Sequence, residues 1–331
     1  MKHRFLIAFA CAAILSRPAS ADVPLGGTTV HFASQNEGRQ ILTAKDEFIQ
    51  RLSPFDRSAR MKTDQAVSED ELLRFVGTNV SDWTREETQT IQAALESIHG
   101  LLHDMPLSLP RPVQLIKTTG AEEGNAAYTR ATAIILPKSE LGKSQTDLKK
   151  LVCHELFHVV SRQNPDLREK LYGIIGFTKC NEITLPPELA RRKITNPDAP
   201  RNDHFIRVKI DGHESLVIPI LLSSVETYDV KRGGEFFEYL QLQFLVVEKD
   251  AGQGNFKPVV DGSSPKLVGM QQLSGFMEQI GKNTQYIIHP EEILADNFAL
   301  LVLGEANVPS PEILQKMREV LKRKSAKIED R

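Results

Sequence analysis

Apolar residues recur at helical spacing over much of the first hundred residues. The clearest case is the segment 86–102, where apolar residues recur every three or four positions and predict one buried helix face. A shorter helix is predicted around 71–76, within a generally helical stretch from 45 to 103. Residues 22–40 are rich in Gly, Thr and Ser, so we expect a loose lead-in there.

The pattern changes to β-strands after the Pro-containing stretch 109–112, which we interpret as a boundary between two lobes. Segments 113–118 and 126–136 are rich in β-branched and other apolar residues and predict strands. Residues 204–222 alternate around Asp211-Gly212, a dipeptide typical of tight turns, and predict a β-hairpin.

Helical patterns return in the middle and at the end of the chain. Ser144 followed by Asp147 resembles a capping box and predicts a helix that runs to about residue 162. The segment 236–247 is apolar, and its spacing favours neither helix nor strand. The mixture of elements predicts an α+β fold. Further helices are predicted over 166–175, 265–280, 291–303 and from 311 onward.

Composition places the chain among ordinary globular proteins. Of its 331 residues 40% are hydrophobic and 25% are charged, which excludes a disordered or fibrous protein. The one long apolar run, 6–15, is shorter than the roughly 20 residues that a membrane-spanning helix needs. Lys2 and Arg4 precede this run, and Ala19-Ser20-Ala21 follows it. This arrangement predicts a signal peptide over 1–21, no integral membrane segment after its cleavage, and a secreted or periplasmic protein.

Charge and cysteine content narrow the expected partners. Residues 1–21 hold three basic residues and no acidic one, so their removal changes the net charge from −2 to −5. A mildly acidic chain without an extended Lys/Arg cluster excludes nucleic acid as the expected partner. Two cysteines remain, Cys153 and Cys180, which are too few for a disulfide framework, and the sequence leaves open whether they pair.

The most informative pentapeptide is His154-Glu155-Leu156-Phe157-His158, which has the form H-E-x-x-H. A spacing of four residues puts both imidazoles on one face of the predicted helix, one turn apart, so both can bind one metal ion. The apolar residues of this helix fall on another face, which leaves the histidines free for such a role. The alternative is that two core or surface histidines lie four residues apart by chance.

A catalytic zinc ion usually has three protein ligands and a water molecule. The predicted helix 291–303 offers Glu292 as the third ligand. Asp296, one turn later, would accept a hydrogen bond from a ligand imidazole and so fix its tautomer. The alternative for Glu292 is that it is simply an acidic residue favoured by the dipole at the N-terminal end of the helix. In that case Glu291 or His289 would be the third ligand.

These two motifs resemble those of the zincin metallopeptidases, specifically the gluzincin branch typified by thermolysin-like enzymes. His154, Glu155 and His158 match the H-E-x-x-H motif, and Glu292 and Asp296 match the E-x-x-x-D pattern of the second helix. The resemblance implies that zinc is bound by His154, His158 and Glu292, that Glu155 is the general base, and that Asp296 orients a ligand histidine. It covers two helices only, and the interval between the motifs is far longer than in thermolysin-like enzymes.

The resemblance also implies an architecture. We expect a zincin-like catalytic domain over 111–331, with a small mixed sheet, an edge strand and an active-site helix, preceded by a helical N-terminal lobe over 22–110. The family's residue that stabilises the oxyanion is not marked by a motif. Tyr228, Tyr286 and His289 are the possibilities that the sequence leaves open.

The implied activity is zinc-dependent hydrolysis of peptide bonds in a peptide or protein substrate, which the strand segment 126–136 would bind by β-addition. An endopeptidase is the first expectation. An aminopeptidase is a weaker variant, in which Glu122 and Glu123 would hold a free amine, and hydrolysis of a non-peptide amide ranks lower. The alternative from another class is a secreted zinc-binding or interaction protein with little or no turnover. Asn196-Pro197-Asp198 is interpreted as an ordinary turn.

Overall fold

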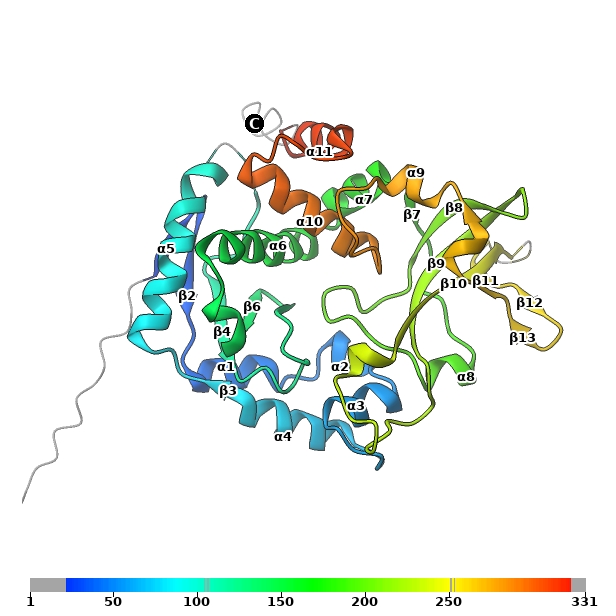
Figure 1. Ribbon diagram of the computed structural model, residues 1–331, viewed down its shortest axis with the longest axis horizontal. Helices are drawn as coiled ribbons and strands as arrows, with labels where there is room; N and C mark the ends of the chain where they lie inside the picture. The colour runs from blue at the N-terminus through cyan, green and yellow to red at the C-terminus, as the bar shows by residue number, and fades with distance from the viewer. Residues whose placement is uncertain (1–21, 104, 106, 251, 253, 323–331) are drawn as a thin grey trace, which may run out of the picture.

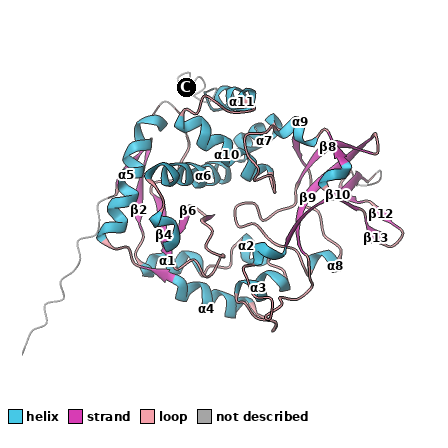
Figure 2. Cartoon of the chain, in the orientation of Figure 1, coloured by secondary structure: helices cyan, strands magenta, loops and turns pink. Residues whose placement is uncertain are grey.

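A computed structural model describes residues 22–322 except 104, 106, 251 and 253. The signal peptide predicted over 1–21 lies outside the described residues. Helices and sheets are both present, so the α+β class is confirmed. The strands gather in two regions on either side of the centre, with helices between and around them (Figure 2). Among the described residues, none of the helices has the length and hydrophobicity that crossing a bilayer requires.

The first sheet contains the strands that precede the H-E-x-x-H motif. Its order is β1-β2-β4-β6-β5, with β3 also paired to β4. The β2–β4 and β4–β6 pairs are parallel, whereas β1–β2 and β5–β6 are antiparallel. This sheet is therefore mixed, and β5 forms one edge of it. Its strands are β1 Val23–Leu25, β2 Thr28–Phe32, β3 Val80–Ser81, β4 Val113–Thr118, β5 Tyr128–Arg130 and β6 Ala133–Pro137.

The expectation of a loose lead-in over 22–40 is wrong, because this stretch forms β1, β2 and part of a helix. Within β2, Thr28, Val30 and Phe32 are buried and alternate with half-buried neighbours, which is the two-residue period of a strand. The strand is so short that its alternating pattern cannot be recognised among the neighbouring Gly and Thr residues. Because β2 pairs with β4, the first sheet runs across the lobe boundary expected at 109–112.

The N-terminal helices begin at reciprocal caps. The Ser68 side chain accepts a hydrogen bond from the Glu71 N–H, and the Glu71 carboxylate accepts one from the Ser68 N–H. Thr84 and Glu87 repeat this arrangement. Such bonds satisfy N–H groups that have no partner within the helix. The helices are α1 Gln35–Leu42, α2 Glu47–Arg51, α3 Pro54–Arg60, α4 Glu69–Asn79 and α5 Arg85–Leu102, so both helices predicted in this region are confirmed.

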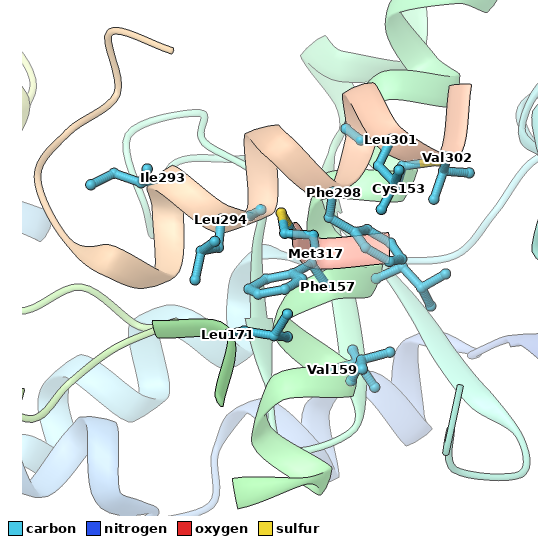
Figure 3. Close-up of a cluster of buried hydrophobic side chains, with 14 of the residues drawn as sticks. Cys153, Phe157, Val159, Leu171, Ile293, Leu294, Phe298, Leu301, Val302 and Met317 are labelled. Carbon is cyan, nitrogen blue, oxygen red and sulfur yellow. The ribbon is translucent and has the colours of Figure 1, made fainter. Parts of the chain in front are cut away.

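Two helices from distant parts of the chain, α6 (Gln145–Gln163) and α10 (Pro290–Leu303), pack together at the centre (Figure 1). Figure 3 shows Phe157 of α6 facing Phe298 of α10, with ring centroids 5.6 Å apart. Met317 of α11 lies over the same cluster. The helices α6 and α10 were both predicted, as were α7 (Pro165–Ile174) and α11 (Pro311–Lys322), and all four are confirmed.

The segment between α7 and α10 builds a second sheet, of order β11-β10-β9-β8-β15, with β14 paired to β10 and β7 to β8. The predicted hairpin over 204–222 is confirmed as β8 and β9, and its turn residues Asp211 and Gly212 both have positive φ. These strands are β7 Phe177–Lys179, β8 His204–Ile210, β9 His213–Ser223, β10 Leu240–Lys249, β11 Phe256–Pro258, β14 Leu267–Val268 and β15 Leu273–Ser274.

Two segments of this region were unclear or wrong in the sequence analysis. The apolar stretch 236–247 is a 3₁₀ turn, Phe236–Tyr239, followed by β10. The helix predicted over 265–280 is wrong for most of its length, because only α9 (Phe276–Ile280) is α-helical there. Gly275, with φ 87°, interrupts any helical path into α9. The remaining short elements are β12 Val260–Asp261, β13 Ser264–Pro265, α8 Pro187–Ala190 and the 3₁₀ turns Lys138–Gly142 and Met270–Gln272.

A buried ion pair connects the N-terminal helices to the two sheets. The Arg60 guanidinium, 1% exposed, donates to Asp56 at 2.7 Å and to both Glu123 oxygens at 2.5 and 2.8 Å. It also donates to the Thr195 carbonyl at 3.2 Å, and the Asp56 carboxylate accepts from the N–H and the hydroxyl of Thr195. Arg60 therefore ties α3, the turn before β5 and the loop at residue 195 into one unit.

Replacement of Arg60 tests this connection. Arg60→Ala leaves the carboxylates of Asp56 and Glu123 buried without their cation, so we expect a loss of about 3–5 kcal/mol in the free energy of unfolding. Lys45→Ala, which removes an exposed partner of Asp70, should leave the unfolding midpoint nearly unchanged. Urea denaturation followed by circular dichroism measures both variants, and equal midpoints would contradict the assigned role.

Candidate metal centre

Helix α6 presents the H-E-x-x-H residues toward α10. Spacing of one turn places His154 and His158 side by side, with ring centroids 4.8 Å apart. The His158 side chain is 1% exposed and the His154 side chain 13% exposed. Glu155, between them, is also buried. The apolar face of the same helix, including Cys153, packs into the core, as the sequence pattern predicted.

Glu292 of α10 meets both histidines, 138 residues away from His154 in the chain. Its Oε2 lies 3.1 Å from His154 Nε2 and 3.6 Å from His158 Nε2. Zinc ligands at roughly 2.0–2.1 Å in a tetrahedron are spaced roughly 3.3 Å apart, so these distances fit a common ion. His158 Nε2 is buried and has no hydrogen-bond partner, which is the condition expected of a ligand atom. The three residues predicted as ligands are therefore brought together.

Each ligand histidine is oriented from behind by a carboxylate. His154 Nδ1 lies 2.9 Å from Asp296 Oδ1, in the role predicted for Asp296. His158 Nδ1 lies 3.0 Å from Glu291 Oε1, a contact that the sequence analysis missed. A carboxylate on Nδ1 holds the proton there and directs the Nε2 lone pair toward the site. Glu291 thus lies on the far side of the His158 ring and is placed as an orienting group rather than as a substitute ligand.

Glu291 is itself held in place. Its Oε2 accepts hydrogen bonds from Ser161 Oγ at 2.8 Å and from the Tyr172 hydroxyl at 2.5 Å. The sequence feature that could have predicted the contact between Glu291 and His158 is the pair of adjacent glutamates, Glu291-Glu292, at the start of a helix. Adjacent helical residues point about 100° apart, so two neighbouring glutamates reach different sides of the facing helix.

The pKa values of the two histidines and of Glu292 indicate which charge the site attracts. Burial lowers the pKa of His154, but its hydrogen bonds to Asp296 and Glu292 outweigh burial and raise it to about 10. The pKa of His158 is also raised, since the facing carboxylates outweigh the effect of its burial. Burial raises the pKa of Glu292, and the two imidazoles lower it well below its usual value. The carboxylates thus attract two positive charges, and a divalent cation supplies the same charge through the Nε2 lone pairs.

Glu155 lies beside the candidate ligands without a complete set of partners. Its Oε2 is buried and unpaired. Burial, and next the charge of Asp198, raise the pKa of the Glu155 carboxyl to about 8. A carboxyl group with a pKa near neutrality and a free oxygen is suited to accept and return a proton.

The loop at residues 194–200, here called the closing loop, contributes two polar residues to the site. Asn196 Nδ2 donates to Glu292 Oε1 at 2.6 Å, so the other oxygen of Glu292 faces the histidines. An Asp198 oxygen lies within 4.8 Å of ligand atoms of Glu155 and His158. Asn196-Pro197-Asp198 was interpreted as an ordinary turn, and the sequence offered no spacing that would relate it to the motifs.

The three possible oxyanion-stabilising residues occupy different places. The Tyr228 hydroxyl donates to the Gly234 carbonyl at 2.9 Å, and the ring packs among other aromatic residues away from the ligands. His289 caps α10, accepting from the Glu291 N–H at Nδ1, and burial lowers its pKa to about 4. Tyr286 stacks on His154 at 6.4 Å between ring centroids and is 42% exposed. Of the three, Tyr286 is the residue that lines the cleft beside Glu155.

Two hollows meet at Glu155 and Tyr286. One is an apolar cleft of about 490 Å³ between the start of β5 and the closing loop. The other is a wider groove of about 1090 Å³ along the N-terminal half of α6. Both also contain Ala126, Ala127 and His154, so the candidate metal centre lies where the groove passes into the cleft.

The acids suggested as a site for a free amine have other partners. The Glu123 carboxylate is engaged by Arg60 in two hydrogen bonds. Glu122 is buried and accepts a hydrogen bond from the Tyr128 hydroxyl at 3.5 Å through Oε1, while its Oε2 is buried without a hydrogen-bond partner. Cys153 and Cys180 are both free thiols, so they form no disulfide here.

Comparison with known proteins gives no match. No protein-family model matches the chain, and no curated protein and no solved structure shows significant similarity to it.

A graded series of variants tests the ligand assignment. Asp296→Asn removes one orienting carboxylate, which costs roughly 10- to 100-fold in zinc affinity at comparable sites. Glu292→Gln removes a ligand and should weaken zinc binding more than Asp296→Asn does. Competition against a zinc-sensitive dye measures both, with Glu305→Gln, an exposed residue after α10, as the unchanged control. Equal affinity in Glu292→Gln and the unaltered chain would remove Glu292 from the ligand set.

Glu122 generates a separate prediction about pH. Burial raises its pKa to about 7, above the 4.5 of the unfolded chain, so the folded state holds its proton more firmly. The folded chain consequently loses stability as the pH rises from about 4 to 7. Glu122→Gln removes this cost and should stabilise the fold by about 3 kcal/mol at pH 8 and very little at pH 4. Urea unfolding at the two pH values measures the difference, and a gain that does not depend on pH would refute the assignment.

Proposed function

We propose that this chain is a zinc-dependent metallopeptidase with a zincin-like catalytic centre. One observation carries the proposal: His154, His158 and Glu292 converge at ligand spacing, with His158 Nε2 buried and unpaired. The free oxygen of Glu155 beside them adds the group that a hydrolase needs next to a bound water molecule. Residues 1–21 support export, and we propose a secreted or periplasmic location.

Zinc held by these three residues would lower the pKa of a bound water molecule toward about 7 and polarise the scissile carbonyl. Glu155 takes the proton of the attacking water and returns it to the leaving amine. Tyr286, stacked on His154 and partly exposed in the cleft, is placed to donate its hydroxyl proton toward the developing oxyanion. Asp296 and Glu291 hold the imidazoles in the ligating tautomer.

The edge strand β5 supports a peptide as substrate. Its first residue, Tyr128, and the two residues before it, Ala126 and Ala127, line the cleft together with His154 and Glu155. A peptide that pairs with this edge would carry its backbone past the Glu155 carboxylate. This arrangement favours a peptide over a small non-peptide amide.

The decisive variant is Glu155→Gln. It keeps all three ligands, so we expect full zinc content and a rate of hydrolysis lower by roughly 10²- to 10⁴-fold, because the proton acceptor is lost. The measurement is mass-spectrometric detection of cleavage in a mixed peptide library, with Glu319→Gln on the exposed face of α11 as the active control.

Removal of zinc with a chelator should abolish cleavage by the unaltered chain, and added zinc should restore it. Undiminished turnover in Glu155→Gln would take Glu155 out of the mechanism. A zinc-loaded chain that cuts no peptide at all would instead support a zinc-binding protein without turnover.

A further inference from the structure

The cleft beside the candidate metal centre is closed at one end. Asp198 Oδ1 of the closing loop accepts hydrogen bonds from the Thr129 N–H at 2.8 Å and from the Thr129 hydroxyl at 2.5 Å. Arg162 of α6 donates to the same hydroxyl at 2.8 Å. Loop, edge strand and helix are thus joined at one point, and a separate pocket lies beyond Asp198, lined by Arg162 and Ala199 among others. We take this junction as the end of the cleft for a bound peptide.

The junction also shortens the usable edge of β5. The Thr129 N–H points away from β6, because it donates to Asp198. Outward backbone groups recur every second residue along a strand, so a substrate strand that continued this pairing would next meet Ala127, the residue directly before β5. Ala127 lines the cleft with His154, whereas the donor of Thr129 is already engaged. Pairing with a substrate is limited to a short stretch that ends near Glu155.

The charge at the closed end favours an ammonium group over a carboxylate. The acids lining the cleft are Glu123, Glu155, Asp198 and Glu292, and none of the described lining residues is a lysine or an arginine. A free α-amino group, whose usual pKa is about 8, is largely protonated at neutral pH. Asp198 Oδ1 is already engaged by Thr129 and lies 3.7 Å from the Arg162 guanidinium, so Oδ2 is the oxygen that an ammonium group of the substrate would meet. The carboxylate of a chain end would face the acids of the cleft wall instead.

One wall of the cleft is apolar. Ile194, Leu221, Leu240 and Ile288 line it, and Phe237, 41% exposed, stands at its margin. All five residues belong to the segment between the two metal-binding helices, outside both motifs. An aliphatic or aromatic side chain of the substrate would find apolar contacts along this wall.

We propose that this chain is an aminopeptidase that removes single residues with apolar side chains, and that Asp198 binds the free α-amino group of the substrate. The inference rests on the proposed peptidase function and names its substrate class. In the reaction, water oxygen adds to the carbonyl carbon of the first peptide bond and the C–N bond breaks. Glu155 carries a proton from that water to the leaving nitrogen, which yields a free amino acid and a shortened peptide.

Matched peptides with free and acetylated amino termini test this proposal on the zinc-loaded chain at pH 7. We expect stepwise loss of N-terminal residues from a leucine-initiated hexapeptide, and at least a roughly 100-fold slower reaction with its acetylated form, because the charge-assisted contact is lost. Internal cleavage of both peptides at similar rates would overturn the inference and leave the peptidase proposal standing. Absence of any cleavage by the zinc-loaded chain would overturn both.

The role of Asp198 has its own readout. For leucine 7-amido-4-methylcoumarin, Asp198→Asn should raise KM by roughly 10- to 100-fold with a much smaller change in kcat, since a binding contact is lost. Asp211→Asn, in the exposed β8–β9 turn, is the matched control. If Asp198→Asn disturbs the closing loop, inhibition of the unaltered chain decides instead: leucinamide should compete at least about tenfold better than N-acetyl-leucinamide. Equal inhibition by the two amides would contradict the assignment.

Discussion

The contact between α6 and α10 is the constraint on which the rest of the structure depends. Phe157 and Phe298 pack at its centre, and Ala295 and Ala299 of α10 are fully buried in it. Small side chains let the two helix axes approach closely, which is what brings the carboxylates of α10 within reach of the imidazoles on α6. Burial of this apolar contact stabilises a polar cluster that would not form in isolation, because removing several charges from water is costly unless they compensate one another.

The carboxylates and histidines of that cluster are paired in a regular pattern. Each ligand histidine has a carboxylate at Nδ1, and Glu292 faces both Nε2 atoms. Protons on the imidazoles or a divalent cation between them balance the acids equally well in charge. His158 Nε2 makes no hydrogen bond, but it lies 3.6 Å from Glu292 Oε2, so a protonated imidazole would also be balanced there. What favours a cation is that both Nε2 atoms face the same Glu292 oxygen, which separate ion pairs do not require.

The sequence predicts those parts of the structure that are determined by residues close together in the chain. The helices α4, α5, α6 and α10 were predictable because caps and apolar spacing are local. The candidate ligands His154, His158 and Glu292 could be named from spacings within α6 and α10. Missed elements depend on tertiary context. The strands β1 and β2 are too short to show their period, and the helix expected over 265–280 is replaced by short strands that pair with β8 and β10. Asn196 and Asp198 carry no local mark at all, because their role comes from where the closing loop is held.

The position of the closing loop separates chemistry from selection in this molecule. The candidate ligands and Glu155 lie on two helices, whereas the apolar wall and Asp198 come from the long segment between them. Arg60 and Asp56 hold Thr195, next to Asn196, through buried hydrogen bonds, and Thr129 holds Asp198. A shift of the loop would expose or unpair these charges, so the loop is rigidly anchored. Under the proposed function, changes to the wall residues would therefore alter which side chain is accepted without moving His154, His158 or Glu292.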